Sequence, residues 1–138
     1  MERTMIPRYR AWDKIHKTMY EADDIVYINF EENQICVKTL FFERASRYDF
    51  DDVVLMQSTG FRDKNGKEIF EGDILKVTNL LSWLEVVSLN EDKAMFVSKE
   101  TKRKVEETPL YDLFNTDIFE VEIIGNIYTN PNLAEVSS

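Results

Sequence analysis

Alternating apolar and polar residues along the chain predict a protein built mostly of β-strands. Residues 24–30 (DIVYINF) place Val26, Ile28 and Phe30 on one side, which predicts a strand buried on that face. After the polar residues 31–33, the β-branched run 34–40 predicts the second strand of a hairpin. Further strands are predicted at 51–57, 84–89, 94–98 and 118–124.

Turn residues divide the central stretch 57–77 into short strands. Asn65-Gly66 predicts a two-residue type I′ hairpin turn, because both central positions of that turn need a positive φ. Gly72-Asp73 predicts a bend or bulge before the next strand. Later in the chain, Thr108-Pro109 predicts the start of a short helix over 109–115.

Composition excludes several classes of protein. The 138 residues suit one domain or two very small ones, and 43% hydrophobic against 31% charged residues is ordinary for a folded protein. A net charge of −9 disfavours general binding to duplex DNA. Cys36 is the sole cysteine, and no stretch of about 18 apolar residues occurs. We therefore expect a cytoplasmic protein that neither crosses nor binds a membrane.

Charge is distributed unevenly along the chain. Residues 105–138 contain seven acids and no Lys or Arg, whereas residues 1–17 contain five basic against two acidic residues. Two interpretations stay open. The two ends can neutralise each other within one fold, or the basic start of one copy can meet the acidic end of the next. Exposed ion pairs contribute only about 0–1 kcal/mol each, so charge would steer such an assembly rather than hold it together.

Catalytic chemistry finds little support. His16 is the single histidine, and Cys36 lies in a predicted strand, where a small buried hydrophobe is the expected role. Neighbouring acids such as Asp51-Asp52 would point to opposite faces of a strand, so they cannot flank one bond. We expect no enzymatic activity, no catalytic or metal-binding residue and no cofactor.

The glycine-containing centre of the chain also has a structural interpretation. Its spacing differs from that of a phosphate-binding loop, which leads from glycines into a helix with Lys-Ser/Thr at the end. Its acids lack the ligand order of a calcium loop, and the chemistry of turns explains them. These acids are Asp63, Glu68, Glu71 and Asp73.

Four blocks of sequence resemble the YopX-like family of phage and prophage proteins. They are YRAWD at 9–13 with Met19, MQSTG at 56–60, DKNGKEIFEGDI at 63–74, and GNIY at 125–128 with Asn130-Pro131. Their order and spacing extend the resemblance from Arg8 to Leu133. The sequence departs from the family pattern at Phe61 and Phe70 (Leu and Tyr expected) and at Asn132 and Ala134 (Glu and Leu expected).

The resemblance implies a fold and a setting rather than a chemistry. It implies an α+β, mostly β protein: a single domain over residues 1–138, with a subdivision near 50–58 into a small α+β N-terminal part and an SH3-like or related small β-barrel part. It also implies a protein encoded by a phage or prophage, made in the bacterial host cytoplasm, that forms a homo-oligomer. The family's biochemical role is undefined, so function has to be argued from the residues.

Two functional hypotheses follow. The favoured one is an oligomeric protein-interaction module whose partner is a phage or host protein, with Trp83, Tyr111 and Phe114 as contact residues. Trp12 could serve as another such anchor, but a core position in the first strand is the simpler interpretation. The alternative is a small single-stranded nucleic-acid binder, in which a β-barrel presents the basic loop at 99–104. The basic residues of that loop are Lys99, Lys102, Arg103 and Lys104.

Overall fold

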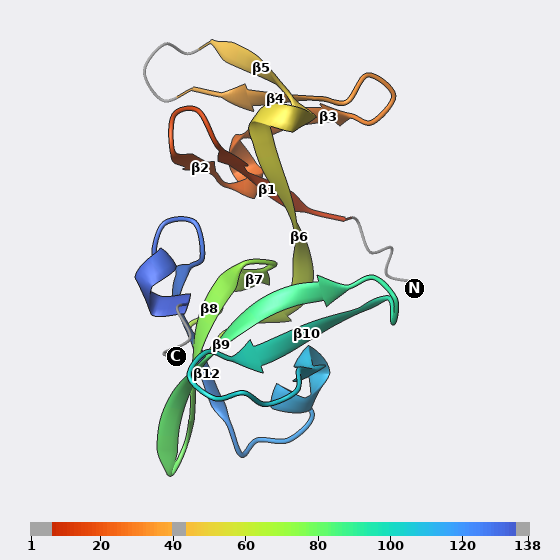
Figure 1. Cartoon of the computed structure of the whole chain (residues 1–138). Helices are drawn as coiled ribbons and strands as arrows, with labels where there is room; N and C mark the ends of the chain where they lie inside the picture. The colour runs from red at the N-terminus through yellow and green to blue at the C-terminus, as the bar shows by residue number, and fades with distance from the viewer. Residues whose placement is uncertain (1–6, 40–43, 135–138) are drawn as a thin grey trace. The chain divides into compact units, whose positions relative to one another are not determined.

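The computed structural model describes residues 7–39 and 44–134, which form two compact units (Figure 1). Unit 1 comprises Met1–Ser58 and unit 2 comprises Thr59–Ser138. Each unit has its own cluster of buried apolar side chains. No helix in the described ranges is both long and apolar enough to span a bilayer.

Unit 1 is made of short antiparallel strands. Strand β1 pairs with both β2 and β6, while β4 pairs with both β3 and β5. The core that these strands enclose consists of Ala11, Ile35, Val37 and Val53, with partly buried aromatic and aliphatic side chains around it. The elements are β1 (Tyr9–Asp13), β2 (Thr18–Tyr20), η1 (Ala22–Asp24), β3 (Ile25–Asn29), β4 (Gln34–Lys38), β5 (Ala45–Asp49), η2 (Phe50–Asp52) and β6 (Val53–Arg62), whose last four residues belong to unit 2.

Strand β3 presents a different face from the one its alternation predicts. Its register against β4 shifts between Ile25 and Tyr27, so that Val26 has no partner in the ladder. Because an extra residue at a bulge reverses the inward and outward positions, Ile25 and Ile28 both pack on the core. Val26 and Phe30 are exposed instead. The prediction of a buried even face was therefore wrong.

Unit 2 contains a five-stranded antiparallel sheet in the order β11-β10-β9-β8-β12, which forms a half-barrel. Its core includes Ile69 from β7, Leu75 and Val77 from β8, Val87 from β9 and Val121 from β12. Leu110 and Leu113 of the short helix η3 complete that core. The elements are β7 (Glu68–Phe70), β8 (Asp73–Asn79), β9 (Leu81–Asn90), β10 (Met95–Glu100), β11 (Thr108–Pro109), η3 (Leu110–Leu113), β12 (Glu120–Asn126) and η4 (Pro131–Ala134).

The turn between β6 and β7 lies at the predicted place but has another geometry. Asp63 and Lys67 bond through their backbones, and the Gly66 amide donates to the Asp63 carbonyl, which leaves three residues in the loop. Of these only Gly66 has a positive φ, at +81°. A three-residue loop of this kind needs one left-handed residue, whereas the predicted type I′ turn needs two. The prediction of that turn type was therefore wrong.

The Asp63 carboxylate explains why the longer loop forms. Its Oδ1 accepts the amides of Asn65 and Lys67 at 2.9 Å each, and its Oδ2 accepts the amide of Ile123 on β12 at 3.0 Å. Burial raises the pKa of Asp63, but these amide hydrogen bonds outweigh it and hold the pKa below its usual range. Asp73 acts similarly, since it accepts the amide of Phe70 at 2.8 Å. Both side chains stabilise turns.

The expected fold class was wrong in two respects. Helical structure among the described residues of unit 1 consists of two 3₁₀ turns of three residues each, η1 and η2, so there is no α+β N-terminal part. The predicted helix over 109–115 is likewise a single 3₁₀ turn, η3. In place of a small closed barrel, unit 2 has a half-barrel. The protein is nearly all β.

Candidate functional site

The surface of unit 2 with the most varied side chains lies beside Trp83 of β9, next to the end of the β9–β10 ladder. Trp83 and Glu85 are two residues apart on β9, so their side chains share one face of the sheet. Glu85 lies opposite Glu100 of β10 in the ladder. Two like charges opposite each other destabilise a sheet unless other groups compensate. The groups around these two carboxylates therefore determine which ligands this surface can bind.

Glu85 is a buried carboxylate held by neutral donors. Only 5% of its surface is exposed. Trp83 Nε1 donates to Glu85 Oε2 at 2.7 Å, and the hydroxyl of Ser98 donates to Oε1 at 2.6 Å. Within residues 7–39 and 44–134, no lysine, arginine or histidine forms an ion pair with it. The charge of Glu85 is hydrogen-bonded but not neutralised.

A cavity of about 320 Å³ opens beside Glu85, and we call it the Trp83 pocket. The rings of Trp83 and Phe119 meet there nearly at a right angle, with an interplanar angle of 87° and centroids 6.1 Å apart. The pocket combines these aromatic rings with four carboxylates and one guanidinium. Its lining residues are Trp83, Glu85, Ser98, Glu100, Arg103, Val105, Glu106, Thr108, Asp112, Leu113 and Phe119.

Arg103 neutralises the second carboxylate, Glu100. Its Nη2 lies 2.9 Å from Oε2 and 3.1 Å from Oε1 of Glu100. The Arg103 side chain is 72% exposed, whereas that of Glu100 is 15% exposed. A flexible surface arginine thus covers a carboxylate that is largely buried.

A second cavity of about 310 Å³ adjoins the first and shares Trp83, Glu100 and Arg103 with it. Lys76 and Lys102 also line this cavity, so its charge is more positive than that of the Trp83 pocket. Thr101 lines it too, and its buried hydroxyl has no hydrogen-bond partner in the part of the chain that the structure describes.

The four basic residues of the nucleic-acid hypothesis lie at the end of β10 and directly after it. Lys99 belongs to β10, and the other three follow that strand. All four are exposed, but only Lys102 and Arg103 line one of the cavities described. Because Arg103 is engaged by Glu100, the positive charge offered to a phosphate is smaller than the sequence suggests.

The three proposed contact aromatics separate in the structure. Trp83 lies within strand β9 and lines both cavities. Tyr111 lies on η3 and is 60% exposed. Phe114 stacks on Phe61 with ring centroids 4.6 Å apart and packs against the core of unit 2. Tyr111 is thus exposed, whereas Trp83 and Phe114 both pack against the core of unit 2.

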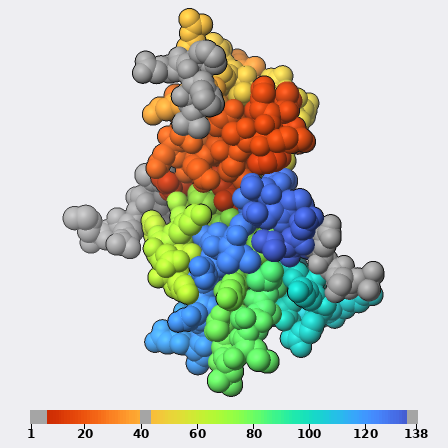
Figure 2. Space-filling view, turned by 90° about the vertical axis from the view of Figure 1, so that its left-hand side faces the viewer, coloured from red at the N-terminus to blue at the C-terminus, as the bar shows by residue number. Residues whose placement is uncertain are grey.

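Sequence reasoning missed the tip of the β8–β9 hairpin. Leu80 is fully exposed and Leu81 is 78% exposed. Leu80 also has a positive φ of 62°. This hairpin tip, green in Figures 1 and 2, projects from the rest of unit 2. The two central residues of the sequence NLLS are leucines, which are not turn residues, and this is why the turn was not foreseen.

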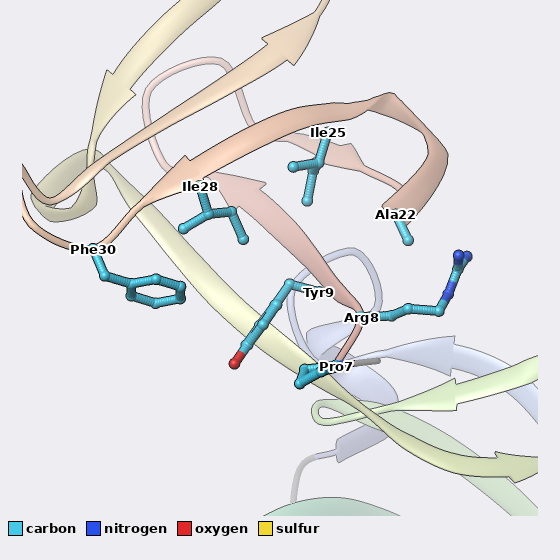
Figure 3. Close-up of a pocket in the computed structure, with 7 residues that line it drawn as sticks. All are labelled: Pro7, Arg8, Tyr9, Ala22, Ile25, Ile28 and Phe30. Carbon is cyan, nitrogen blue, oxygen red and sulfur yellow. The ribbon is translucent and has the colours of Figure 1, made fainter. Parts of the chain in front are cut away.

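Unit 1 has a hollow of a different kind, an apolar groove of about 420 Å³ that Figure 3 shows in close-up. The Tyr9 and Phe30 rings meet edge to face at 6.1 Å on one side of it, and Ile25 and Ile28 project from β3 on the other. Its one charged group is the exposed Arg8 guanidinium, 3.4 Å from Asp23. The groove residues are Pro7, Arg8, Tyr9, Ala22, Ile25, Ile28 and Phe30.

The histidine of unit 1 belongs to a buried hydrogen-bond network. His16 is exposed, as the sequence predicts, but its Nδ1 lies 2.7 Å from Oδ2 of the fully buried Asp13. Asp13 Oδ1 accepts the amides of Ile15 and His16 at 2.9 Å each. Burial works against ionisation of Asp13, but these hydrogen bonds outweigh it and lower its pKa. Trp12 and Cys36 are both buried, as expected of core residues.

Two solved structures share this fold. The crystal structure of protein EF1440 from Enterococcus faecalis aligns with a TM-score of 0.60 at 25% identity, covering 96% of this chain and 100% of that one. The crystal structure of protein yopX from Bacillus subtilis aligns with a TM-score of 0.62 at 22% identity, covering 93% of this chain and 98% of that one. A comparison with curated proteins gives no match.

The family model of the YopX protein matches residues 8–135, which is most of the chain. This range covers most of both units and agrees with the extent of the four sequence blocks that resemble the family. The chain belongs to the YopX protein family.

Proposed function

We propose that this chain is a non-enzymatic protein-interaction module that binds its partner through the Leu80-Leu81 hairpin tip and the adjoining Trp83 pocket. The fully exposed Leu80 in a left-handed conformation is the observation that carries the proposal. Trp83 follows Leu81 by two positions on β9, so an apolar projection and an aromatic pocket lie close together in the chain.

Folding alone does not explain a leucine at this position. A left-handed conformation costs an L-residue other than Gly roughly 1–2 kcal/mol, and Asn or Gly tolerates it better. Since Leu80 is fully exposed, it gains no burial that would offset this cost. Strained residues and exposed apolar tips are typical of binding surfaces, where the compensating contact comes from the partner.

The partner that fits is another polypeptide of the phage or its host. Tryptophan is among the residues that most often dominate binding energy at protein interfaces. The tip offers the apolar centre of such an interface, and the exposed Glu106 and Asp112 of the pocket offer its polar rim.

Replacing Leu80 by Asn separates binding from folding. The variant Leu80→Asn should melt at the same or a higher temperature, because Asn accepts the positive φ. Affinity purification from phage-infected or induced cells, with nuclease present, should then recover less of the partner that copurifies with the unaltered chain. Ile118→Asn is the matched control, since Ile118 is 59% exposed on the same unit. Equal recovery with Leu80→Asn would contradict the proposal.

Single-strand nucleic-acid binding is a second candidate because Lys76, Lys102 and Arg103 share a cavity with Trp83. If it occurs, binding should weaken steeply with salt and fall in the triple variant Lys102→Ala, Arg103→Ala, Lys104→Ala. We expect no complex tighter than about 10⁻⁴ M at physiological salt, the weak end of non-specific binding. A salt-sensitive micromolar complex would favour this candidate over the first.

We also expect the chain to form a closed homo-oligomer. Its two small cores each leave apolar surface exposed, and contacts between copies commonly supplement such cores. Light scattering after size exclusion at micromolar concentration measures this directly. A mass near 16.3 kDa at every dilution would exclude it. An oligomer that persists in high salt would show that apolar contacts rather than charge hold it.

A further inference from the structure

We propose that the Trp83 pocket binds an organic cation, namely the ammonium or guanidinium group of a partner's lysine or arginine side chain. This inference rests on the proposed function in one respect only, that the source of the cation is a polypeptide. The pocket's preference for a cation follows from its own geometry.

The first argument is the buried charge of Glu85. A carboxylate that is 5% exposed and has two neutral donors gains from any cation that comes within reach. Trp83 Nε1 and the Ser98 hydroxyl already hold both of its oxygens in place, so the carboxylate does not have to reorganise when a ligand enters.

The second argument is the arrangement of aromatic rings, which is independent of the acids. Trp83 and Phe119 pack edge to face at an interplanar angle of 87°, and both rings line the pocket. The face of an aromatic ring attracts a cation, and tryptophan does so most strongly. Two aromatic rings beside a carboxylate are the groups that make up a cage for ammonium groups. At about 320 Å³ the pocket reaches the lower end of the ~300–1,000 Å³ range of ligand cavities.

The third argument is the behaviour of Arg103. The guanidinium of this chain's own exposed arginine lies bidentate on Glu100, which is mostly buried. It thus shows that a carboxylate in this pocket accepts a guanidinium. Arg103 competes with an incoming cation for Glu100, so its removal should strengthen binding.

The test uses the intact chain and small probes, and the fluorescence of Trp83 is the readout. The cationic probes are the N-acetyl N-methylamides of lysine and arginine, and the neutral ones are the same derivatives of norleucine and citrulline. Citrulline keeps the shape of arginine, and norleucine keeps the four-carbon chain of lysine, but both lack the charge. We expect saturable changes with both cationic probes and none with the neutral ones. Trp83→Phe should abolish the change, which separates Trp83 from the other tryptophan, Trp12. Equal responses to charged and neutral probes would overturn the proposal.

Variants of the pocket sharpen this test. Glu85→Gln keeps the side-chain shape and should weaken the cationic probes about tenfold, since it removes the buried charge. Arg103→Ala should strengthen binding about two- to threefold by freeing Glu100. Asp92→Asn, an equal change of charge on the β9–β10 turn, is the control and should have no effect. If Glu85→Gln lowers the melting temperature, Asp112→Asn at the exposed rim replaces it and should weaken binding about twofold. Unchanged affinity in both carboxylate variants would overturn the proposal.

Two further arms separate this inference from the proposed function. Leu80→Asn should bind the probes normally even though it loses the partner, since Leu80 is not a lining residue of the pocket. Free 1,4-diaminobutane tests the other source of an ammonium group. If the diamine saturates the pocket and neither amino-acid probe does, the pocket serves a small amine and the proposed polypeptide source is wrong.

Discussion

The hollow in unit 1 and the hollow in unit 2 differ in chemistry more than in size. The groove of unit 1, at about 420 Å³, is lined by apolar side chains and one arginine already paired with Asp23. The Trp83 pocket, at about 320 Å³, contains a buried carboxylate with no charged partner in the described chain. The smaller hollow therefore makes the stronger case for selective binding, because buried polar groups fix what a ligand must offer, whereas an apolar groove accepts many shapes.

Each unit also has a buried aspartate, and the hydrogen-bond partners of these two aspartates differ from those of Glu85. Asp63 of unit 2 accepts three backbone amides and, among the described residues, no side-chain donor. Asp13 of unit 1 forms hydrogen bonds with two backbone amides, the ring of the exposed His16 and the hydroxyl of Tyr20. All of these bonds are internal, so both carboxylates are satisfied by the fold. Glu85 differs from them in that no backbone amide binds it among the described residues and a pocket adjoins it.

The largest effect is expected from Asp63→Ala. This change leaves the amides of Asn65, Lys67 and Ile123 without their acceptor, and we expect the free energy of unfolding to fall by about 2–4 kcal/mol. Thermal or urea unfolding measures this. Asp92→Ala, at an exposed turn, should stay within about 0.5 kcal/mol of the unaltered chain. If the two variants were equally stable, the duty assigned to Asp63 would be wrong.

A pH-dependent effect is expected in unit 1. The pKa of Asp13 in the folded chain lies below its value in the unfolded chain, so the unfolded state binds more protons in acid. The stabilisation from Asp13 should be fully present above the unfolded pKa and disappear as the pH falls through the folded one. Asp13→Asn should flatten this part of the curve of unfolding free energy against pH. A curve as steep as that of the unaltered chain would refute the assignment.

A smaller effect is expected at Gly66. An added Cβ would meet nothing within 4 Å, so a substitution there changes only the backbone conformation. Gly66→Val should cost about 1 kcal/mol or more because of the positive φ, and Gly66→Asn should cost less. Melting temperatures of the two variants decide this, and an equal cost would show that φ is not the cause.

The smallest effect is expected at the groove of unit 1. Phe30 is 60% exposed, so Phe30→Ser should change the free energy of unfolding by less than about 1 kcal/mol. It should also leave partner recovery unchanged, in contrast to Leu80→Asn. Copurification with the two variants side by side makes this comparison. Loss of the partner in Phe30→Ser alone would assign the binding site to unit 1.

Sequence patterns located most strands and turns but not their details. The bulge at Val26 reversed the face of β3, and nothing in the alternation of DIVYINF signals a bulge. The Asn65-Gly66 turn was located, yet its type depends on the Asp63 carboxylate, whose bond to Ile123 joins residues 60 positions apart. Such long-range contacts leave no periodic trace. The family resemblance predicted the family correctly. The α+β N-terminal part, which the resemblance also implied, was wrong.

The candidate site was predicted only in part. Trp83, Lys102 and Arg103 were selected from the sequence and do line adjoining cavities. Glu85, Phe119 and the Leu80-Leu81 tip were missed. A glutamate in a strand normally faces solvent, and its burial becomes visible only when β10 brings Ser98 to it. The strain at Leu80 comes from its positive φ, and a leucine in the sequence does not predict a positive φ.

Photo-crosslinking in cells tests the central claim most directly, because it compares the two units under one condition. A photoreactive phenylalanine analogue replaces Leu81 at the tip of unit 2 in one variant and Phe30 at the groove of unit 1 in another. Both positions are exposed, so each tolerates the larger ring. We predict that irradiation joins the chain to a second polypeptide from position 81 and not from position 30. Adducts from position 30 alone would contradict the account.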